Sequence, residues 1–259
     1  MTWLSRFRRA GVLVLLILVG GCASVPKEYR DPRDPLESYN RGMHQFNTDF
    51  DNAFFKPVAK GYKAITPEPV DRGVTNFFNN IADVTSAVNN LLQFKLSRFG
   101  SDVGRVATNS TVGILGFFDV ATNMGLPSYK EDFGQTLGYW GADSSPYFVL
   151  PLLGPSTVRD TVGLAGDIVV DPFFSLDESR IYWGFIALRA IDTRADLLTA
   201  SKILEEAAVD PYIFVRDAYL QRRRNQIFDG NPPPDPYEED LWEEEQQEGA
   251  GGEAAADAG

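Results

Sequence analysis

The sequence predicts an all-α fold. Apolar residues recur at steps of three and four along several segments, which is the period of a helix that buries one face. The alternation of apolar and polar residues that is typical of a half-buried strand is almost absent. About 200 residues lie between a short N-terminal leader and an acidic C-terminal end, which is enough for one domain with a core.

The N-terminus predicts a lipoprotein. Residues 1–21 begin with a basic stretch and continue with an apolar run of about 11 residues, which is too short to span a bilayer and is typical of a signal peptide. Cys22 follows two glycines and is the only cysteine in the 259 residues. The pattern resembles a bacterial lipobox, in which this thiol is lipidated; an ordinary signal peptide with an accidental cysteine is the alternative. Ala23 resembles an outer-membrane sorting signal.

Two polar segments flank the predicted domain. Residues 22–33 form a short proline-rich tether that keeps the domain close to the membrane. From Asp235 onward the chain holds ten acidic residues and no basic one. We therefore expect residues 231–259 to be a disordered acidic tail, and an acidic lure for a basic partner is the alternative. These ten acids account for much of the net charge of −12, and the remaining folded part is still mildly acidic, which argues against nucleic acid as a partner.

Two long amphipathic helices open the folded part, which we assign to residues 34–230. Apolar residues from Leu36 to Tyr62 predict the first helix, with Asp34 as its N-cap and a bend at Pro57. A proline-rich break follows, and apolar residues from Val70 to Leu92 predict the second helix.

The central part of the chain is rich in small residues. From residue 98 to residue 125, glycine, alanine and threonine are interspersed with large apolar residues, and small residues allow helices to approach closely. The run from Val112 to Val120 is apolar on most sides but far too short to cross a bilayer, and residues 160–174 are similar.

Three further helices complete the prediction. One covers residues 179–189, one begins with Asp192 as its N-cap, and the last begins at Asp210 before a proline. The last helix ends in three arginines, 222–224. These cations can complement the helix dipole in solvent or bind phosphate, and the sequence does not choose between the two roles.

The sequence contains little that points to catalysis. His44 is the only histidine, so a serine–histidine–aspartate triad would depend on it entirely. There is no nucleophile elbow, phosphate-binding loop or dinucleotide fingerprint, and one histidine with one cysteine is too few ligands for zinc. We expect no catalytic residue, no metal, no cofactor and no enzymatic activity, although chemistry by aspartates alone stays open. We expect His44 to be a surface or interfacial side chain.

Several local motifs, taken in order, resemble one family. They are Asp34-Pro35-Leu36-Glu37 with Asn40-Arg41 and Phe46-Asn47, Gly116-Phe117-Phe118-Asp119, Glu131-Asp132-Phe133-Gly134, Gly154-Pro155-Ser156 with Arg159-Asp160, Thr193-Arg194, and Asp210-Pro211-Tyr212 with Arg216. Each motif is weak alone, but the ordered set behind a lipobox is specific. Over about 200 residues the chain resembles the MlaA (VacJ) family of outer-membrane lipoproteins.

The resemblance implies a ring of amphipathic helices that lies in the inner leaflet of the outer membrane, on its periplasmic side, around an amphipathic channel. It implies that the protein removes mislocalised phospholipid from the outer leaflet, associates with a trimeric porin of the OmpC/OmpF type and passes the lipid to a periplasmic carrier of the MlaC type. Such activity maintains lipid asymmetry and needs no cofactor. A structural porin-associated lipoprotein and, less favoured, a membrane-bound hydrolase are the alternatives.

The resemblance also implies a set of candidate channel or motif residues. They are Asn40, Arg41, Asn47, Asp119, Asp132, Arg159, Asp160, Arg194 and Arg216. With this family as a guide, we expect irregular apolar backbone from Tyr147 to Leu153, lying in lipid or lining the channel, because Pro151 argues against a buried strand. Ser156 is then the expected N-cap of a helix that carries Arg159 and Asp160. For the latter two residues, a local ion pair of little consequence is the alternative.

Overall fold

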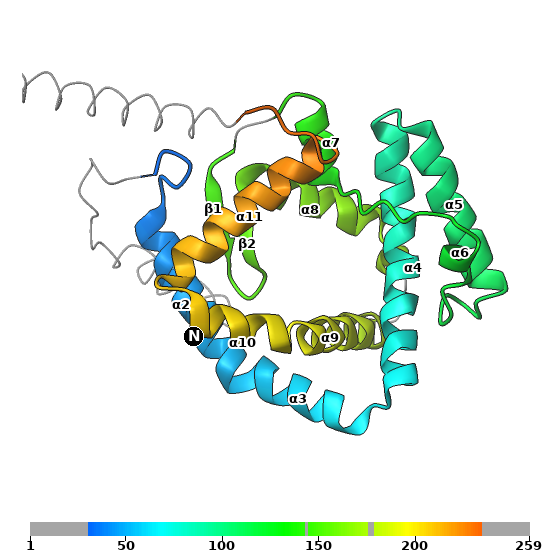
Figure 1. Cartoon of the computed structure of the whole chain (residues 1–259), viewed down its shortest axis with the longest axis horizontal. Coiled ribbons are helices and arrows are strands. Elements are labelled where there is room, and N and C mark those ends of the chain that lie inside the picture. Colours follow the sequence, from blue (N-terminus) through cyan, green and yellow to red (C-terminus); the bar gives the residue numbers. More distant parts are fainter. Residues whose placement is uncertain (1–30, 143–144, 176–178, 235–259) are drawn as a thin grey trace, which may run out of the picture.

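Figure 1 shows a computed structural model of the chain, which describes residues 31–142, 145–175 and 179–234. Helices follow one another around a ring; α5 lies outside that ring against α4, and α6 packs on α5 (Figure 1). The first half contains α2 (Glu37–Phe50), the π-helical turn η2 (Asp51–Phe55), α3 (Lys56–Ile65), α4 (Glu68–Leu92), α5 (Leu96–Thr111) and α6 (Val120–Asn123). The second half contains α7 (Phe133–Tyr139), β1 (Tyr147–Leu150), β2 (Gly154–Thr157), α8 (Val158–Val170), the 3₁₀ turn η3 (Pro172–Ser175), α9 (Ser179–Asp196), α10 (Leu198–Ala207) and α11 (Pro211–Ile227).

The predicted all-α class is confirmed. Within the described residues, β1 and β2 are the only strands, and they form one antiparallel hairpin. No helix in the same parts of the chain is both long and apolar enough to cross a bilayer. The predictions on the signal peptide, on Cys22, on most of the tether and on the tail from residue 235 lie outside the described residues.

The first predicted helix is continuous from α2 through η2 to α3, and η2 is a π-helical turn near its middle. The N–H of Lys56 donates to the carbonyl of Asp51, five residues earlier, just before Pro57. A proline has no N–H to donate to the preceding turn, so the wider π turn forms where the regular bonding is interrupted. The bend predicted at Pro57 therefore has a specific form. The predicted N-cap is wrong, because Leu36 occupies that position and the Asp34 side chain is buried elsewhere.

The expectation of irregular backbone from Tyr147 to Leu153 is wrong for Tyr147–Leu150, which form β1, and is confirmed only for the turn at residues 151–153. Tyr147 pairs with Thr157 and Leu150 pairs with Gly154, so Pro151 falls in the turn between the strands and interrupts no ladder bond. Tyr147 and Val149 are buried, whereas Leu152 and Leu153 in the turn are exposed. A short hairpin therefore ends in an apolar, solvent-accessible turn.

Three helix starts differ from the prediction in detail. The Thr157 side chain, not that of Ser156, accepts the N–H of Asp160 and caps α8. Asp192 lies inside α9, which runs on past residue 189 to Asp196, so it does not cap α10. Asp210 caps α11 as predicted, by accepting the N–H groups of the two residues after Pro211.

Candidate functional site: a polar interior between the helices

The described residues show an inverted distribution of polarity. Twenty polar or charged residues are buried there, against ten apolar ones. Large apolar side chains are exposed instead, among them Ile65, Leu115 and Val169 at 82%, 68% and 68%. A protein that folds in water has the opposite arrangement. We take the polar interior as the candidate functional site.

The hairpin of α4 and α5 is joined by a ladder of polar side chains. Asp83 in α4 accepts a hydrogen bond from Arg105 Nε in α5 at 2.9 Å. One turn further along, Asp102 in α5 accepts from Ser86 and from Asn90, both at 2.8 Å. Polar residues spaced three or four apart on each helix produce these rungs, because that spacing places them on one face. Burial raises the pKa of Asp102, which has no cationic partner.

Asp119 connects the outer end of this ladder to α6. It caps α6 by accepting the N–H of Thr122 at 3.1 Å, and it accepts from Arg105 and Asn109 at 3.1 and 3.0 Å. Burial alone would raise the pKa of Asp119. The hydrogen bonds from Thr122, Asn109 and Arg105 outweigh that effect and lower the pKa to about 2. The carboxylate is therefore ionised and holds the turn after α5.

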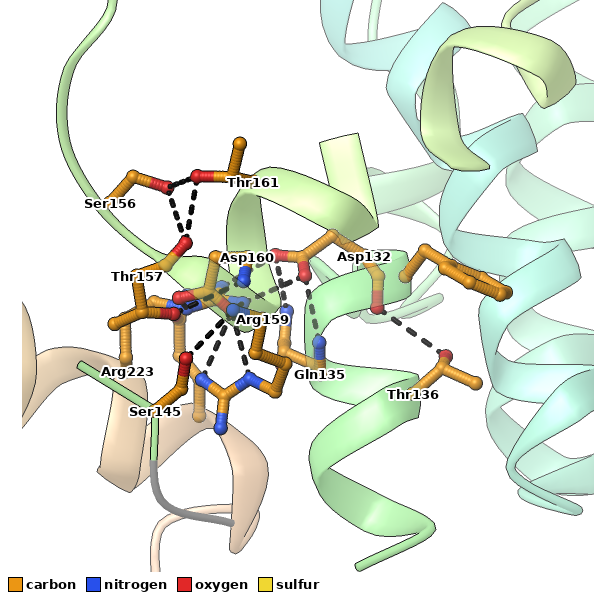
Figure 2. A network of polar contacts seen from close by, with 12 residues as sticks. Asp132, Gln135, Thr136, Ser145, Ser156, Thr157, Arg159, Asp160, Thr161 and Arg223 are labelled. Carbon is orange, nitrogen blue, oxygen red and sulfur yellow. Dashed lines mark hydrogen bonds and ion pairs between the residues drawn. The ribbon is translucent and has the colours of Figure 1, made fainter. Parts of the chain in front are cut away.

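Arg223 of α11 bridges two carboxylates at the ends of α7 and α8 (Figure 2). Its NH1 and NH2 donate to Asp132 at 2.6 and 2.9 Å, and its Nε and NH2 donate to Asp160 at 3.0 and 2.8 Å. Asp132 also caps α7 through the N–H of Gln135. Gly134 leaves the room for this clamp, because a Cβ there would lie 2.5 Å from Asp160 and 2.7 Å from Arg223. One guanidinium thus ties three helices together.

The clamp holds its carboxylates ionised. Burial would raise the pKa of Asp132 and of Asp160, but hydrogen bonds and charge attraction from Arg223 outweigh it and lower both pKa values. Arg159 packs on Asp160 through its Nε at 3.0 Å and donates to the carbonyl of Ala142 at 3.1 Å. The predicted pair Arg159–Asp160 is therefore part of a buried network and not an isolated surface ion pair.

Asp167 of α8 connects the same region to α4. It accepts the N–H of Phe133, at the start of α7, at 3.0 Å and the amide of Asn89 at 3.1 Å. Burial raises the pKa of Asp167 to about 6, and the neighbouring Asp132 carboxylate acts in the same direction against the hydrogen bond from Phe133.

Two asparagine side chains of α2 form hydrogen bonds with the backbone at the free edge of β1, as a neighbouring strand would. The Asn40 side chain donates to the carbonyl of Tyr147 at 3.1 Å and accepts the N–H of Val149 at 2.9 Å. Asn47 does the same for the carbonyl of Leu150, at 2.8 Å, and the N–H of Leu152, at 2.7 Å. Seven helical residues rise about 10 Å, and three strand residues also rise about 10 Å. The spacing of the two asparagines therefore matches the strand edge.

Acidic residues just before α2 bind polar and basic residues of α11. Asp34 is 1% exposed and accepts from Asn40 at 2.8 Å and from the Tyr212 hydroxyl. Arg216 of α11 pairs with Asp31 at 3.0 Å and with Asp34 at 3.5 Å. The end of the predicted tether is thus packed against the last helix.

The remaining two candidate residues each fasten a helix pair. Arg41 pairs with Glu37 at 2.7 Å and with Asp210 at 2.9 Å, and its guanidinium lies 4.5 Å from the centre of the Tyr212 ring. Arg194 of α9 makes a bidentate pair with Asp51 of η2, with both contacts at 2.7 Å. These pairs join α2 to α11 and the π turn to α9.

The structure distributes the nine candidate residues over several clusters and does not gather them into one site. Their role in a channel stays a prediction. Sequence reasoning missed Asp83, Asp102 and Arg105, although polar residues at helical spacing in α4 and α5 carried the signal. The helix-dipole argument treated arginines 222–224 alike, and only the family resemblance distinguishes Arg223, which is buried in the clamp, from Arg222, which is exposed.

The described residues offer no evident metal site, since they contain no group of three or more histidine, cysteine, aspartate or glutamate side chains that could hold an ion. His44 packs edge-on against Tyr212, with ring centres 5.7 Å apart, and burial lowers its pKa. No hydroxyl among the described residues is hydrogen-bonded to its ring.

The fold and the interior together define a protein of the all-α class, in which a ring of helices is joined by buried polar side chains. A model of the MlaA lipoprotein family matches residues 32–226, and the chain belongs to that family. It is 34% identical to the intermembrane phospholipid transport system lipoprotein MlaA of Escherichia coli, over 84% of this chain and 87% of that one. It is also 34% identical to an uncharacterised protein of Rickettsia felis, over 75% of this chain and 78% of that one.

A solved structure gives the same result for the fold. It is described as the "structural basis for maintenance of bacterial outer membrane lipid asymmetry" and is 34% identical in sequence. The two structures superpose with a TM-score of 0.67, over 78% of this chain and 100% of the other. The ring of helices is therefore the fold of the family.

We predict that Arg223→Ala lowers the free energy of unfolding by roughly 3 kcal/mol, because it leaves the carboxylates of Asp132 and Asp160 without their cation. Denaturant unfolding of the detergent-solubilised protein measures this. Arg222→Ala, at the exposed neighbouring position, is the matched control and should change the free energy by less than about 0.5 kcal/mol. Equal effects of the two substitutions would contradict the clamp.

We predict that acidification stabilises the wild type relative to Asp167→Asn between about pH 7 and pH 4.5. The pKa of Asp167 in the folded chain is raised to about 6, so as the pH falls the folded chain takes up a proton before the unfolded chain does. Burial of the charged carboxylate lowers the stability of the folded chain, and this cost disappears as the carboxylate is protonated below about pH 6. The difference should reach roughly 2 kcal/mol. Parallel pH profiles of unfolding for the two proteins would argue against a raised pKa.

Proposed function

We propose that this chain is an outer-membrane lipoprotein that moves phospholipid between the membranes of the bacterial envelope. It takes mislocalised phospholipid from the outer leaflet through an amphipathic channel and passes it to a periplasmic carrier of the MlaC type. It works beside a trimeric porin of the OmpC/OmpF type and maintains lipid asymmetry. The named relatives support the transport of phospholipid, and the description of the similar structure supports a link to asymmetry.

The inverted polarity is the observation on which the proposal depends. A ring with exposed apolar side chains and buried charged ones is suited to apolar surroundings, where polar contacts between helices replace the hydrophobic effect. Helices too short or too polar to cross a bilayer can lie in one leaflet with their apolar faces toward the acyl chains. The lipid anchor expected at Cys22 would hold the ring there.

The energetics explain why lipid transfer needs such a device. A phospholipid carries about 30 methylene groups, so its unaided exit into water costs on the order of 25 kcal/mol. A barrier of that height permits roughly 10⁻⁶ to 10⁻⁵ events per second. Flipping between leaflets is hindered for the opposite reason, because the charged headgroup must cross hydrocarbon.

A passage with polar and apolar walls lowers both barriers. Polar side chains of the ring can accommodate the headgroup while apolar flanks accommodate the tails. No nucleotide or nucleophile is required for this. The direction of flow then comes from the affinity of the carrier or from an energised partner downstream of it.

A deletion strain tests the function directly. We predict that loss of the gene raises the phospholipid exposed on the cell surface several-fold, measured by labelling exposed amine headgroups on intact cells. The wild-type gene should restore the normal level, and Cys22→Ala should not, because the ring would lose its anchor. An unchanged level of surface phospholipid in the deletion strain would sink the transport proposal, and weakened porin assembly in its place would favour a structural role.

The hydrolase alternative makes a different prediction. We expect His44→Ala to restore the deletion strain as fully as the wild type, because His44 packs against Tyr212 and activates no hydroxyl of the described residues. Surface phospholipid and free fatty acid in the medium are the two quantities to measure. A failure of His44→Ala to complement, with normal protein level and thermal stability, would reopen the hydrolase class.

A further inference from the structure

An exposed aromatic patch lies where α4 turns into α5. It comprises Phe94 and Leu96 from the turn and Tyr139 and Trp140 from the end of α7, and we call these four residues the corner patch. Their exposed fractions are 70%, 64%, 48% and 63%. The rings of Phe94 and Trp140 lie 5.8 Å apart, so the patch is continuous between the two elements.

The corner patch is held in a fixed arrangement. The Trp140 indole N–H donates to the carbonyl of Leu92 at 3.2 Å, which fixes the ring on the surface. Phe94 adopts a φ of 58°, in the left-handed region that residues other than glycine rarely occupy. The N–H of Lys95 then donates to the carbonyl of Asn90 at 2.9 Å and closes the turn. Phe94 therefore points outward from a constrained backbone.

The C-terminal end of the described chain is fastened to the rim of this patch. Lys95 donates to Asp229, just after α11, at 2.7 Å, and Arg98 pairs with the same carboxylate. Lys95 also lies 5.7 Å from the centre of the Tyr139 ring. Arg224 donates to the carbonyls of Pro233 and Pro234, which holds the following residues close to α11. The chain thus contacts the rim of the patch at Asp229 and then runs back beside α11 to Pro234, after which the residues beyond the described part begin.

The residues that come next have the composition that this patch would accept. Tyr237, Leu241 and Trp242 are the large apolar residues beyond Asp235, and all three fall within eight residues of Pro234. Eight extended residues reach about 26 Å. Acidic residues surround them, while Lys95 and Arg98 at the rim of the patch are already paired with Glu131 and Asp229, so the apolar residues are the ones that can bind the patch. A tethered segment needs only weak intrinsic affinity, because its effective concentration lies in the millimolar range.

We propose that residues 237–245 dock on the corner patch of the same chain. Tyr237, Leu241 and Trp242 cover the four residues of the corner patch, and the acidic side chains between them stay in solvent. The acidic C-terminus is then an intramolecular cover for one exposed apolar surface. This proposal does not depend on the transport of phospholipid.

Disulfide trapping in the full-length lipidated protein tests the docking. Ser97→Cys places a thiol on an exposed position beside the patch, and Glu243→Cys places one beside Trp242, so the three apolar residues of the segment and the four residues of the patch are all kept. Mild oxidation should link this pair at least tenfold faster than the control pair Thr199→Cys with Glu243→Cys. Thr199 is equally exposed but belongs to α10, at another part of the ring (Figure 1). Equal rates for the two pairs would overturn the proposal.

Two substitutions show whether the apolar contact is responsible. Trp242→Ser lies in the segment itself and cannot unfold the ring through the described contacts, and it should reduce the trapping rate to that of the control pair. Phe94→Ser should do the same, whereas Ile65→Ser, which removes an exposed apolar residue from α3, should leave the rate unchanged. Trapping that persists in Trp242→Ser overturns the proposed contact.

The competing occupant of the patch is lipid. The trapping experiment is therefore repeated in vesicles of phosphatidylethanolamine and phosphatidylglycerol. Docking predicts the same preference for Ser97→Cys in vesicles as in detergent. Loss of the preference in vesicles alone would assign the corner patch to the acyl chains and overturn the proposal.

Discussion

Contacts between buried polar side chains hold the ring together, and the rest of the structure depends on them. In water, a buried ion pair such as Asp83–Arg105 gains little over an apolar pair of the same size, because desolvation offsets the attraction. In apolar surroundings, by contrast, polar contacts between helices are favoured over apolar ones. Apolar side chains gain nothing there by leaving lipid for a neighbouring helix, while each polar contact between helices contributes roughly 0.5 to 2 kcal/mol. An interior made of polar rungs is thus effective where the exterior is apolar.

The same constraint explains the close backbone contacts. The aspartate side chains of the clamp are short, so the helices that they join approach closely, and a Cβ at Gly163 would lie 2.4 Å from the backbone nitrogen of Gly134. That approach brings the start of α7 within reach of Asp167 and Arg223, which fasten it from two sides. The small residues of α8, which in the sequence suggested close helix packing, are therefore required by the polar clamp.

The sequence predicted the helices better than the contacts between their ends. Apolar periodicity found α4 and α11, whose lengths and starts follow from local rules. It failed at Asp34 and Asp192, which look like caps but bind distant partners: Tyr212 and Arg216 for the first, Tyr62 and Thr75 for the second. Apolar periodicity also failed at β1, whose residues show no clear alternation of apolar and polar side chains. These residues form a strand because β2 binds one edge of their backbone and the Asn40 side chain binds the other. The spacing of Asp83, Ser86 and Asn90 places these polar residues on one face of α4. That face would ordinarily be assigned to solvent, and it is recognised as a buried contact only once the interior is known to be polar.

Helix α3 shows how a ring of this kind can separate two environments. Phe54, Val58 and Ile65 form an exposed apolar stripe that begins in η2, while Lys60 and Lys63 point to the other side, since two residues along a helix correspond to a rotation of about 200°. Ala59, fully buried between these faces, marks the side that packs into the ring. The face of α3 that packs into the ring therefore lies between its apolar face and its charged face. A helix arranged in this way is stable where lipid covers one side of the ring and water covers the other, and its ten residues, about 15 Å long, have no need to cross the bilayer.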